Sequence, residues 1–210
     1  MIDNSLRYLI GLTLIPGIGA VTARKLISYT GSAEAIFKEK KGTLLKIPDI
    51  GEKIAQAITS TDVLNAADEE IDYASRHSVR VLTVSDSGYP SRLKHCADAP
   101  LVLFCKGVAD LNCPKMLAIV GTRHATGYGK EVTETIIQDF YKHGMEVSIV
   151  SGLAFGIDIA AHKAALKNGL STIGVVAHGL DMLYPSTHRN IANDMLAQGA
   201  VVSEFPTKTI

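Results

Sequence analysis

The sequence lacks tryptophan, has only three cysteines and carries no net charge. Cys96, Cys105 and Cys113 are odd in number and form no C-x-x-C pair, which argues against a disulfide framework or a zinc site and predicts reduced thiols. With 21 basic and 21 acidic residues there is no overall basic field, so binding to nucleic acid would require a local patch. No hydrophobic run reaches the length of a membrane span, and the apolar start at 6–18 lacks the basic flank of a signal peptide. We therefore expect a cytoplasmic protein with no membrane partner.

The residues that are present indicate two domains. The hydrophobic and charged fractions, 47% and 20%, are those of an ordinary globular protein, and 210 residues allow one large or two modest domains. We predict a small all-α domain over residues 1–76 and an α/β domain over residues 77–210. A polar, mostly acidic helix at 65–77 is expected to connect them.

A short repeat organises the first domain. Residues 15–19, IPGIG, recur 32 residues later as IPDIG at 47–51, and each copy lies between two helical patterns. The arrangement resembles a helix-hairpin-helix motif in a SAM-like domain, in which the hairpin amides and the next helix N-terminus contact a DNA phosphate without reading bases. Gly17, Gly19 and Lys25 are the predicted contacts. The alternative is that the two hairpins only pack together, because local basic charge is poor.

The second domain is organised around residues 116–163, which read as strand, turn, helix, strand, turn and helix. Apolar runs at 117–120 and 147–150 predict parallel strands, and the first run has the unbroken hydrophobicity of a strand covered on both faces. Further strands are expected at 172–177 and 200–203. Together these patterns predict a Rossmann-like, mostly parallel sheet with helices on both faces.

Two turns of this unit predict an anion site. Residues 121–129 and 151–158 follow successive parallel strands, and right-handed crossovers bring such turns to the same, carboxyl edge of the sheet. Each turn precedes a helix whose first amides are unpaired and whose dipole favours an anion. With Arg123 and two threonine hydroxyls, the turns predict a phosphate-binding rim. Three further side chains fall at or near the same edge: His178, Asp181 and Tyr184.

The residues predict neither a nucleotide cofactor nor catalysis at this rim. The dinucleotide pattern G-x-G-x-x-G and the Walker pattern G-x-x-x-x-G-K-[ST] are absent, and Ser151 is not in a G-x-S-x-G elbow. No carboxylate–histidine spacing makes a metal site of His162, His178 and His188. We expect no cofactor, no metal and no catalytic residue.

Three segments of the second domain resemble the central motifs of the DNA-processing protein A (DprA/Smf) family, in that family's order and spacing. They are IVGTRHATGYG, VSGLAFGIDIAAHKAAL and GVVAHGLDMLYPSTHR, preceded by the similar stretch VRVLTVSDSGYPSRLKHCADAPLVLFCKG. The resemblance implies a protein that is not an enzyme and that binds single-stranded DNA without sequence preference. It also implies protection of incoming DNA during natural transformation, loading of the RecA recombinase in DNA recombination, and a homodimer when the protein is full length.

The resemblance also assigns roles to residues. The family's G-S-R motif corresponds to residues 121–123, which implies that Arg123 holds a phosphate bidentately. Its S-G-x-A-x-G-I-D motif corresponds to residues 151–158, in which Asp158 is expected to cap the helix or orient a neighbour rather than touch phosphate. The predicted DNA- or phosphate-binding residues are Gly121, Thr122, Arg123, Thr126, Tyr128, Gly129, Ser151, Gly152, Ala154, Phe155, Gly156, His162 and Lys163.

The chain departs from the family pattern at three places. Phe155 stands where many members carry Arg or Lys, and the bases of the strand are expected to face its ring or that of Tyr128. His188 stands where the family often has asparagine. The family's domain continues beyond the equivalent of residues 204–206, so we expect this chain to be truncated inside the domain, which bears on dimerisation and on tight DNA binding.

Two other classes of function stay open. The first is a nucleotide-binding or nucleotide-hydrolysing enzyme of the lysine-decarboxylase-like Rossmann type. That class requires a P-G-G-x-G-T-x-x-E signature, whereas Glu204 stands alone here at a strand end. The second is a protein-interaction module with a vestigial pocket, whose helical repeat recruits a partner protein.

Overall fold

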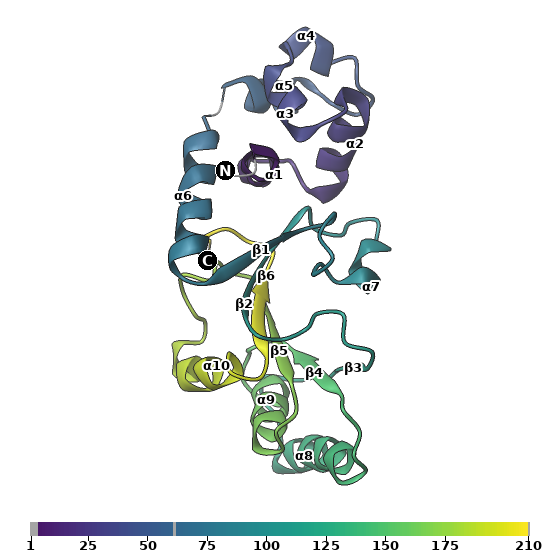
Figure 1. Ribbon diagram of the computed structural model, residues 1–210, viewed down its shortest axis with the longest axis vertical. Helices are drawn as coiled ribbons and strands as arrows, with labels where there is room; N and C mark the ends of the chain where they lie inside the picture. The colour runs from purple at the N-terminus through teal and green to yellow at the C-terminus, as the bar shows by residue number, and fades with distance from the viewer. Residues whose placement is uncertain (1–3, 61, 210) are drawn as a thin grey trace. The chain divides into compact units, whose positions relative to one another are not determined.

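The computed structural model describes residues 4–60 and 62–209, which form two compact units (Figure 1). The first unit comprises residues 1–103 and the second residues 104–210. This division lies further along the chain than the predicted domain boundary at 76/77, because the segment from 77 to 103 groups with the helices that precede it. The domain boundary itself stays a prediction.

The first unit consists of short helices followed by a strand. Its elements are α1 (Asn4–Leu14), α2 (Ala20–Thr30), α3 (Ala33–Lys38), α4 (Lys41–Leu44), α5 (Glu52–Ser60), α6 (Leu64–Arg76), β1 (Val79–Thr83) and α7 (Ser91–Lys94). Arg24 of α2 donates hydrogen bonds to the carbonyls of Ala97 and Ala99, which fixes the loop after α7 within this unit. The loop therefore continues the helical unit instead of forming a separate layer.

The sequence repeat corresponds to a repeated backbone geometry. Gly17, in the turn between α1 and α2, has φ +85°, and Asp49, in the turn between α4 and α5, has φ +66°. Both residues are in the left-handed region, which glycine adopts freely and which aspartate tolerates better than most residues. Ile15, Ile18 and their counterparts in the second copy are buried. The two hairpins are thus built alike and anchored by the same apolar positions.

The second unit is an α/β sheet whose strands are mostly parallel. Its elements are β2 (Val102–Gly107), which begins at the end of the first unit, β3 (Met116–Ala118), α8 (Gly127–Lys142), β4 (Ser148–Ser151), α9 (Ile157–Lys167), β5 (Thr172–Val176), the short 3-10 helix η1 (Ser186–His188), α10 (Arg189–Met195) and β6 (Ala200–Ser203). The strand order of this unit is β2-β6-β5-β4-β3. Strands β3 to β6 are parallel and β2 is antiparallel to β6, so the predicted α/β class with a mostly parallel sheet is confirmed.

The three connections that link β3 to β4, β4 to β5 and β5 to β6 all run in the same direction across the sheet. Since β3, β4, β5 and β6 are adjacent in chain order, right-handed crossovers place α8, α9 and α10 on one face, which differs from the expected cover on both faces. The core agrees: Ile149 of β4 packs with α8 and α9, and Val201 of β6 packs with α9 and α10. The carboxyl edge of the four parallel strands therefore carries all the loops that precede these helices.

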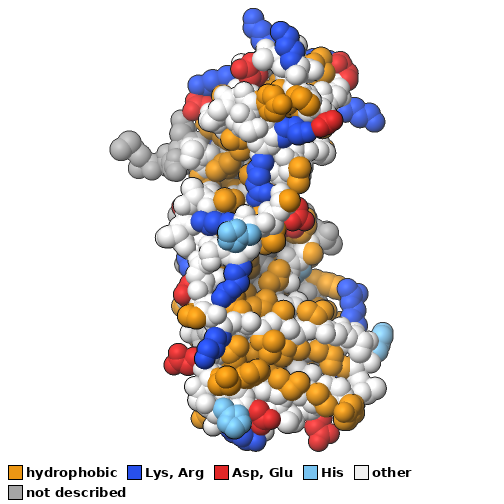
Figure 2. All heavy atoms as spheres, turned by 90° about the vertical axis from the view of Figure 1, so that its right-hand side faces the viewer, with side chains coloured by type: hydrophobic (Ala, Val, Ile, Leu, Met, Phe, Trp, Pro, Cys, Tyr) orange, Lys and Arg blue, Asp and Glu red, His pale blue; other side chains and the backbone are white. Residues whose placement is uncertain are grey.

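The prediction that the strand at 117–120 is covered on both faces is wrong. β3 is the last strand in the order, and beyond its end the Val120 side chain is 76% exposed. Val175, although in the middle of the sheet, is 52% exposed. Figure 2 shows hydrophobic side chains gathered in a broad patch on one face of this unit.

No helix in the described part of the chain is long and apolar enough to cross a membrane.

Candidate nucleic-acid interface

The two predicted turns meet backbone to backbone at the carboxyl edge. The amide of Ile157 donates to the carbonyl oxygen of Thr122 over 3.2 Å. Gly156 has φ +85°, and a Cβ added there would lie 2.0 Å from the same Thr122 oxygen and 2.7 Å from the carbonyl carbon of Arg123. Only glycine allows this approach, so the second turn fixes the path of the first and, with it, the position of Arg123.

A cavity of about 400 Å³ opens beside these turns. Its lining comes from Arg123, from the loop 152–155, from 175–178 at the end of β5 and from Met182, Tyr184 and Pro185. It therefore brings together four predicted site residues, Arg123, Gly152, Ala154 and Phe155, with eight that the predicted set did not contain. The Arg123 side chain is exposed, and no hydrogen bond or ion pair is found for it within residues 4–60 and 62–209.

The threonines of the first turn shape the backbone. The Thr122 hydroxyl oxygen accepts from the amide of His124, and the Thr126 hydroxyl oxygen accepts from the amide of Gly129, both over 3.1 Å. Thr126 is therefore the N-cap of α8. Gly121 packs against Ile157, whereas Tyr128 is 77% exposed and does not line the cavity. The two threonine hydrogen bonds therefore fix the conformation of the turn that carries Arg123.

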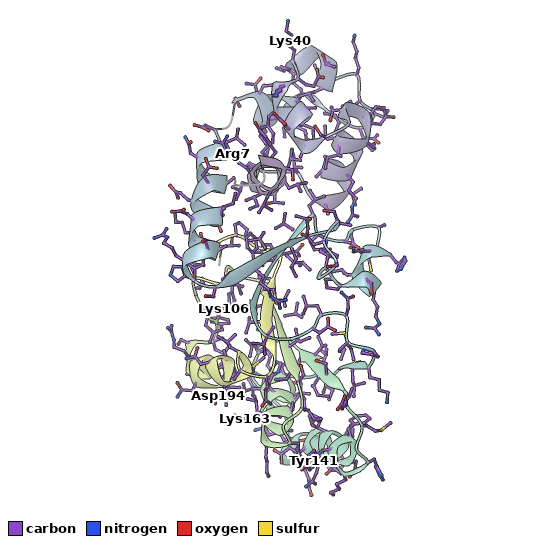
Figure 3. The ribbon with its side chains drawn as sticks, in the orientation of Figure 1. Arg7, Lys40, Lys106, Tyr141, Lys163 and Asp194 are labelled. Atoms are coloured by element: carbon purple, nitrogen blue, oxygen red, sulfur yellow. The ribbon has the colours of Figure 1, made fainter. Side chains whose placement is uncertain are left out.

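Ser151 and His162 lie buried below the rim, so the prediction that their side chains touch phosphate is wrong. Ser151 is buried, and its hydroxyl donates to the carbonyl of Ile119 over 2.6 Å. The His162 side chain has no exposed surface, because α9 packs it against β4 and β5. Both side chains brace the loops from beneath. Lys163, the next residue on α9, is exposed but does not line the cavity (Figure 3).

The hydrogen bonds of His162 identify its proton. Nε2 lies 2.5 Å from the Gly152 carbonyl oxygen, which can only accept, so Nε2 carries a hydrogen. Nδ1 lies 2.7 Å from the hydroxyl oxygen of Thr172, which is also 3.1 Å from the Ile149 carbonyl oxygen, so in the neutral ring these two acceptors share the one hydroxyl hydrogen. Burial lowers the pKa of His162, and the nearby charge of His188 acts in the same direction. The Gly152 bond and the carboxylate of Asp158 oppose that shift without cancelling it.

The lowered pKa of His162 predicts that stability falls in mild acid. Below the ordinary histidine value of 6.5, the unfolded chain takes up a proton that the folded chain resists. The free energy of unfolding should therefore decrease as pH falls below that value, by at most about 1.4 kcal/mol per pH unit for one proton. Urea unfolding between neutral and mildly acidic pH measures the slope. His162→Gln should flatten it, whereas the same change at exposed His143 should not.

Asp158 lies in the first turn of α9, whose N-cap residue is Gly156. The residue is 7% exposed, and within the described residues its Oδ1 has no hydrogen-bond partner. A Cβ on Gly152 would lie 2.6 Å from its Oδ2, so the loop passes directly over the carboxylate. The positive end of the helix dipole favours this charge, and the carboxylate points into the protein instead of opposing a phosphate.

His178 and His188 support the aromatic wall of the cavity. The amide of Tyr184 donates to Nε2 of His178 over 3.2 Å, so the ring hydrogen is on Nδ1 and is donated to the Gly179 carbonyl. Nδ1 of His188 donates to the carbonyl of Leu153, and its ring contacts Phe155 edge to face, with centroids 4.9 Å apart. The described residues contain no group of three His, Cys, Asp or Glu side chains that could hold a metal ion.

The predicted hairpin contacts are only partly available in the first unit. Lys25 forms an ion pair with Asp49, the residue that replaces the hairpin glycine in the second copy. The Lys25 hydrogen bond and charge lower the pKa of Asp49. Gly17 and Gly19 form the turn before α2, and Gly19 begins that helix with extended backbone and no side-chain cap. The cation expected to meet a phosphate is therefore engaged within the unit.

Comparison with known proteins gives matches to both units. The family model described as DNA recombination-mediator protein A matches residues 80–210, and that of the SAM-like helix-hairpin-helix tandem matches residues 9–61. A Mycobacterium tuberculosis protein named putative DNA processing protein DprA is 29% identical over 219 residues, which cover 98% of this chain and 54% of that protein. The chain spans about half the length of the curated relatives that it matches along its whole length.

Two solved structures are also similar. The crystal structure of DNA processing protein A from Streptococcus pneumoniae superposes with a TM-score of 0.76 and 29% identity, covering 97% of this chain and 69% of that one. The Helicobacter pylori protein of the same name, described for its unique single-stranded DNA binding mode, gives a TM-score of 0.52 and 30% identity. That match covers 62% of this chain and 58% of the other.

Proposed function

The chain belongs to the DNA recombination-mediator protein A family, as its motifs predicted, and on this premise we propose that its second unit binds single-stranded DNA through phosphates. The observation that carries the proposal is the exposed Arg123 at the mouth of the cavity, held there by Gly156 and Ile157. A guanidinium with no internal partner among the described residues is ready to take a phosphate bidentately. The Helicobacter pylori relative is described as binding single-stranded DNA.

The cellular role follows from the same family membership. We infer a part in DNA processing during natural transformation, in which the protein covers incoming strands, loads the RecA recombinase and acts as a homodimer when full length. The cycle is one of binding without bond-making. Ser151 donates its hydroxyl hydrogen to a backbone carbonyl, and within the described residues no histidine is hydrogen-bonded to it, which supports a binding protein over a hydrolase.

Fluorescence anisotropy of labelled oligo-dT tests the binding directly. The chain is titrated at two salt concentrations, with unlabelled single-stranded and duplex DNA of equal length as competitors. We expect binding that weakens with salt, because phosphate contacts release counterions, and better competition by the single strand. Absence of binding at both salt concentrations, or equal competition by duplex, would contradict the proposal. Release of base or phosphate from nucleotides would favour the enzyme alternative.

The helical unit offers a second DNA contact. We propose that the hairpin at Gly17 and Gly19 approaches a phosphate, supported by its left-handed turn, by the amides that begin α2 and by the match to a helix-hairpin-helix tandem. The ion pair between Lys25 and Asp49 weakens this proposed contact, because it engages the lysine that would meet the phosphate. The second copy is the poorer candidate, because Asp49 places a carboxylate at its tip.

Asp49→Asn is expected to strengthen DNA binding if the hairpin touches phosphate. Asparagine tolerates the left-handed backbone, and the change removes a negative charge and releases Lys25. The log–log salt slope should steepen by up to about one unit, as for one added phosphate contact. Anisotropy titrations measure it, with Asp72→Asn, which breaks an exposed ion pair on α6, as the matched control. Unchanged binding by Asp49→Asn would leave the hairpins a packing role only.

A further inference from the structure

We propose that a second cavity, at the amino edge of the parallel strands, binds a small dipolar ion of the α-amino acid class. This edge is opposite to the one that carries Arg123, so the site does not depend on the proposed function. The cavity has a volume of about 540 Å³, within the usual range of small-ligand sites. Its lining comes from three segments at the starts of strands: 113–115 before β3, 146–148 entering β4 and 169–171 before β5.

Two opposite charges at this cavity are unpaired in the described part of the chain. Lys115 and Glu146 are both exposed and both line the cavity, and within residues 4–60 and 62–209 neither side chain forms an ion pair or a hydrogen bond. The segments that carry them are adjacent, since the amide of Ser148 donates to the carbonyl of Lys115 over 2.9 Å. A ligand with both a carboxylate and an ammonium group would pair with both charges at once.

A pair of serines in the lining supplies a hydrogen-bond donor for the carboxylate. Ser148 is 3% exposed, and its hydroxyl donates to the hydroxyl oxygen of Ser171 over 3.0 Å. Ser171 is half-buried, and among the described residues its own hydroxyl hydrogen has no acceptor. That hydrogen is therefore available to a carboxylate oxygen of the ligand, which the charge of Lys115 also attracts.

The helix ends at this edge favour the ammonium group. α8 and α9 each run back from the carboxyl edge to the amino edge, so the C-terminal ends of both helices, where the dipole is negative, lie on this side of the sheet. Gly169 of the lining follows directly after the C-cap of α9. Lys142 and Lys167, in the last turns of the two helices, do not line the cavity. With Glu146, the helix ends favour a cationic group and oppose a second phosphate site.

The rest of the lining indicates the side chain of the ligand. Apart from Gly169, the remaining residues of the lining are apolar or weakly polar: Cys113, Pro114, Val147 and Leu170. Surfaces of this kind stabilise a buried aliphatic group through the hydrophobic effect. The lining therefore fits an amino acid with an aliphatic side chain, and L-leucine is the probe.

The experiment uses the whole chain, with the thiol of Cys113 as a reporter in the site itself. Cys113 is partly exposed and lines the cavity, whereas Cys96 is exposed in the first unit and serves as the internal control. Alkylation of each cysteine by iodoacetamide is followed by mass spectrometry as L-leucine is added. We expect leucine to slow alkylation of Cys113 in a saturable manner and to leave that of Cys96 unchanged. Isothermal titration calorimetry measures the Kd independently of the thiol.

Two blocked analogues test the two charges separately on the wild-type chain. Leucinamide keeps the ammonium group and lacks the carboxylate, whereas N-acetylleucine keeps the carboxylate and lacks the ammonium group. Each should bind at least about ten-fold more weakly than leucine, as expected for the loss of one charge-assisted hydrogen bond. Because no residue of the protein is changed, this comparison does not depend on the folding of a variant.

Charge-removing variants assign each group of the ligand to a residue. Lys115→Met should weaken binding of leucine and N-acetylleucine about ten-fold and leave leucinamide unchanged. Glu146→Gln should weaken binding of leucine and leucinamide and leave N-acetylleucine unchanged. Lys130→Met and Glu134→Gln, which remove exposed charges on α8 outside the lining, are the matched controls and should alter no affinity.

Three outcomes would overturn the site. Leucine at millimolar concentration could neither protect Cys113 nor give a heat of binding. The blocked analogues could bind as tightly as leucine, in which case the two charges do not recognise a dipolar ion. Inorganic phosphate could protect Cys113 in place of leucine, which would make the cavity an anion site. None of these results would alter the expectation for oligo-dT at the opposite edge of the sheet.

Discussion

Arg123→Ala should raise the Kd for oligo-dT at least about ten-fold, since a charge-assisted, bidentate phosphate contact is lost. The loss should be large because the chain has no net charge and thus no surrounding basic field to compensate for one missing cation. The side chain is exposed and within residues 4–60 and 62–209 has no ion-pair partner, so its removal leaves no buried group unsatisfied. Stability should therefore be unchanged, and anisotropy at two salt concentrations measures the effect.

The salt dependence identifies the contact as a phosphate contact. Each lost phosphate contact on a single strand should reduce the log–log slope by about 0.7. Arg123→Lys should retain part of the affinity, because the charge remains and the fork geometry is lost. Arg76→Ala, which removes an exposed ion-paired arginine on α6, serves as the matched control. Equal binding by wild type and Arg123→Ala would favour the protein-interaction alternative, in which the pocket is vestigial.

Gly156→Ala should strongly destabilise the second unit, costing more than about 3 kcal/mol. The added Cβ would meet backbone atoms of residues 122 and 123, which cannot rotate away as a flexible side chain would. The positive φ at this position adds strain of its own. Urea unfolding measures the loss, and DNA binding should fall with it, because relief of the clash displaces the turn that carries Arg123.

The Gly144→Ala variant distinguishes the destabilisation caused by a steric clash from that caused by the positive φ alone. Gly144 also has a positive φ, +62°, but a Cβ there would meet no atom within 4 Å. Alanine at this position should cost only about 1–2 kcal/mol, the ordinary cost of a left-handed residue. If Gly156→Ala were no more harmful than Gly144→Ala, the two turns would not be in the contact that the structure shows.

Periodicity and turn chemistry predicted the main architecture. The repeat at 15–19 and 47–51 indicated paired hairpins, and the structure shows the same left-handed turn in both. Apolar runs that end in glycine-containing turns indicated parallel strands with their loops at one edge, and this is the observed sheet. These features follow from local sequence because a turn conformation or a buried strand restricts the residues at each position.

The direction of individual side chains could not be predicted in this way. Ser151 was assigned to the rim, yet its partner is the Ile119 carbonyl, 32 positions away across the sheet. His162 is among the predicted contacts, whereas helix packing turns it inward. The position of a strand within the sheet depends on how the strands are arranged in space. The local sequence therefore gives no indication that β3 lies at the edge of the sheet or that Val120 is exposed.

Several residues that line the cavity could not be predicted for a similar reason. Met182 and Val175 carry no motif, and the predicted set left Tyr184 out although the sequence placed it near the same edge. The segment after β5 has no hydrophobic period to define its path, and its position depends on the bond between the Tyr184 amide and His178. A histidine followed six residues later by an aromatic is too weak a signal to reveal that bond.

The contact between the two turns has a consequence for the entropy of binding. Because the backbone of Gly156 lies against that of Thr122 and Arg123, the protein side of the site is rigid before any strand arrives. Under the proposed function, the conformational entropy lost on binding is then lost almost wholly by the nucleic acid, whose backbone must become ordered. The affinity for a strand should therefore depend on how readily that strand orders, so the flexibility of the DNA would set preferences that no residue of the protein reads.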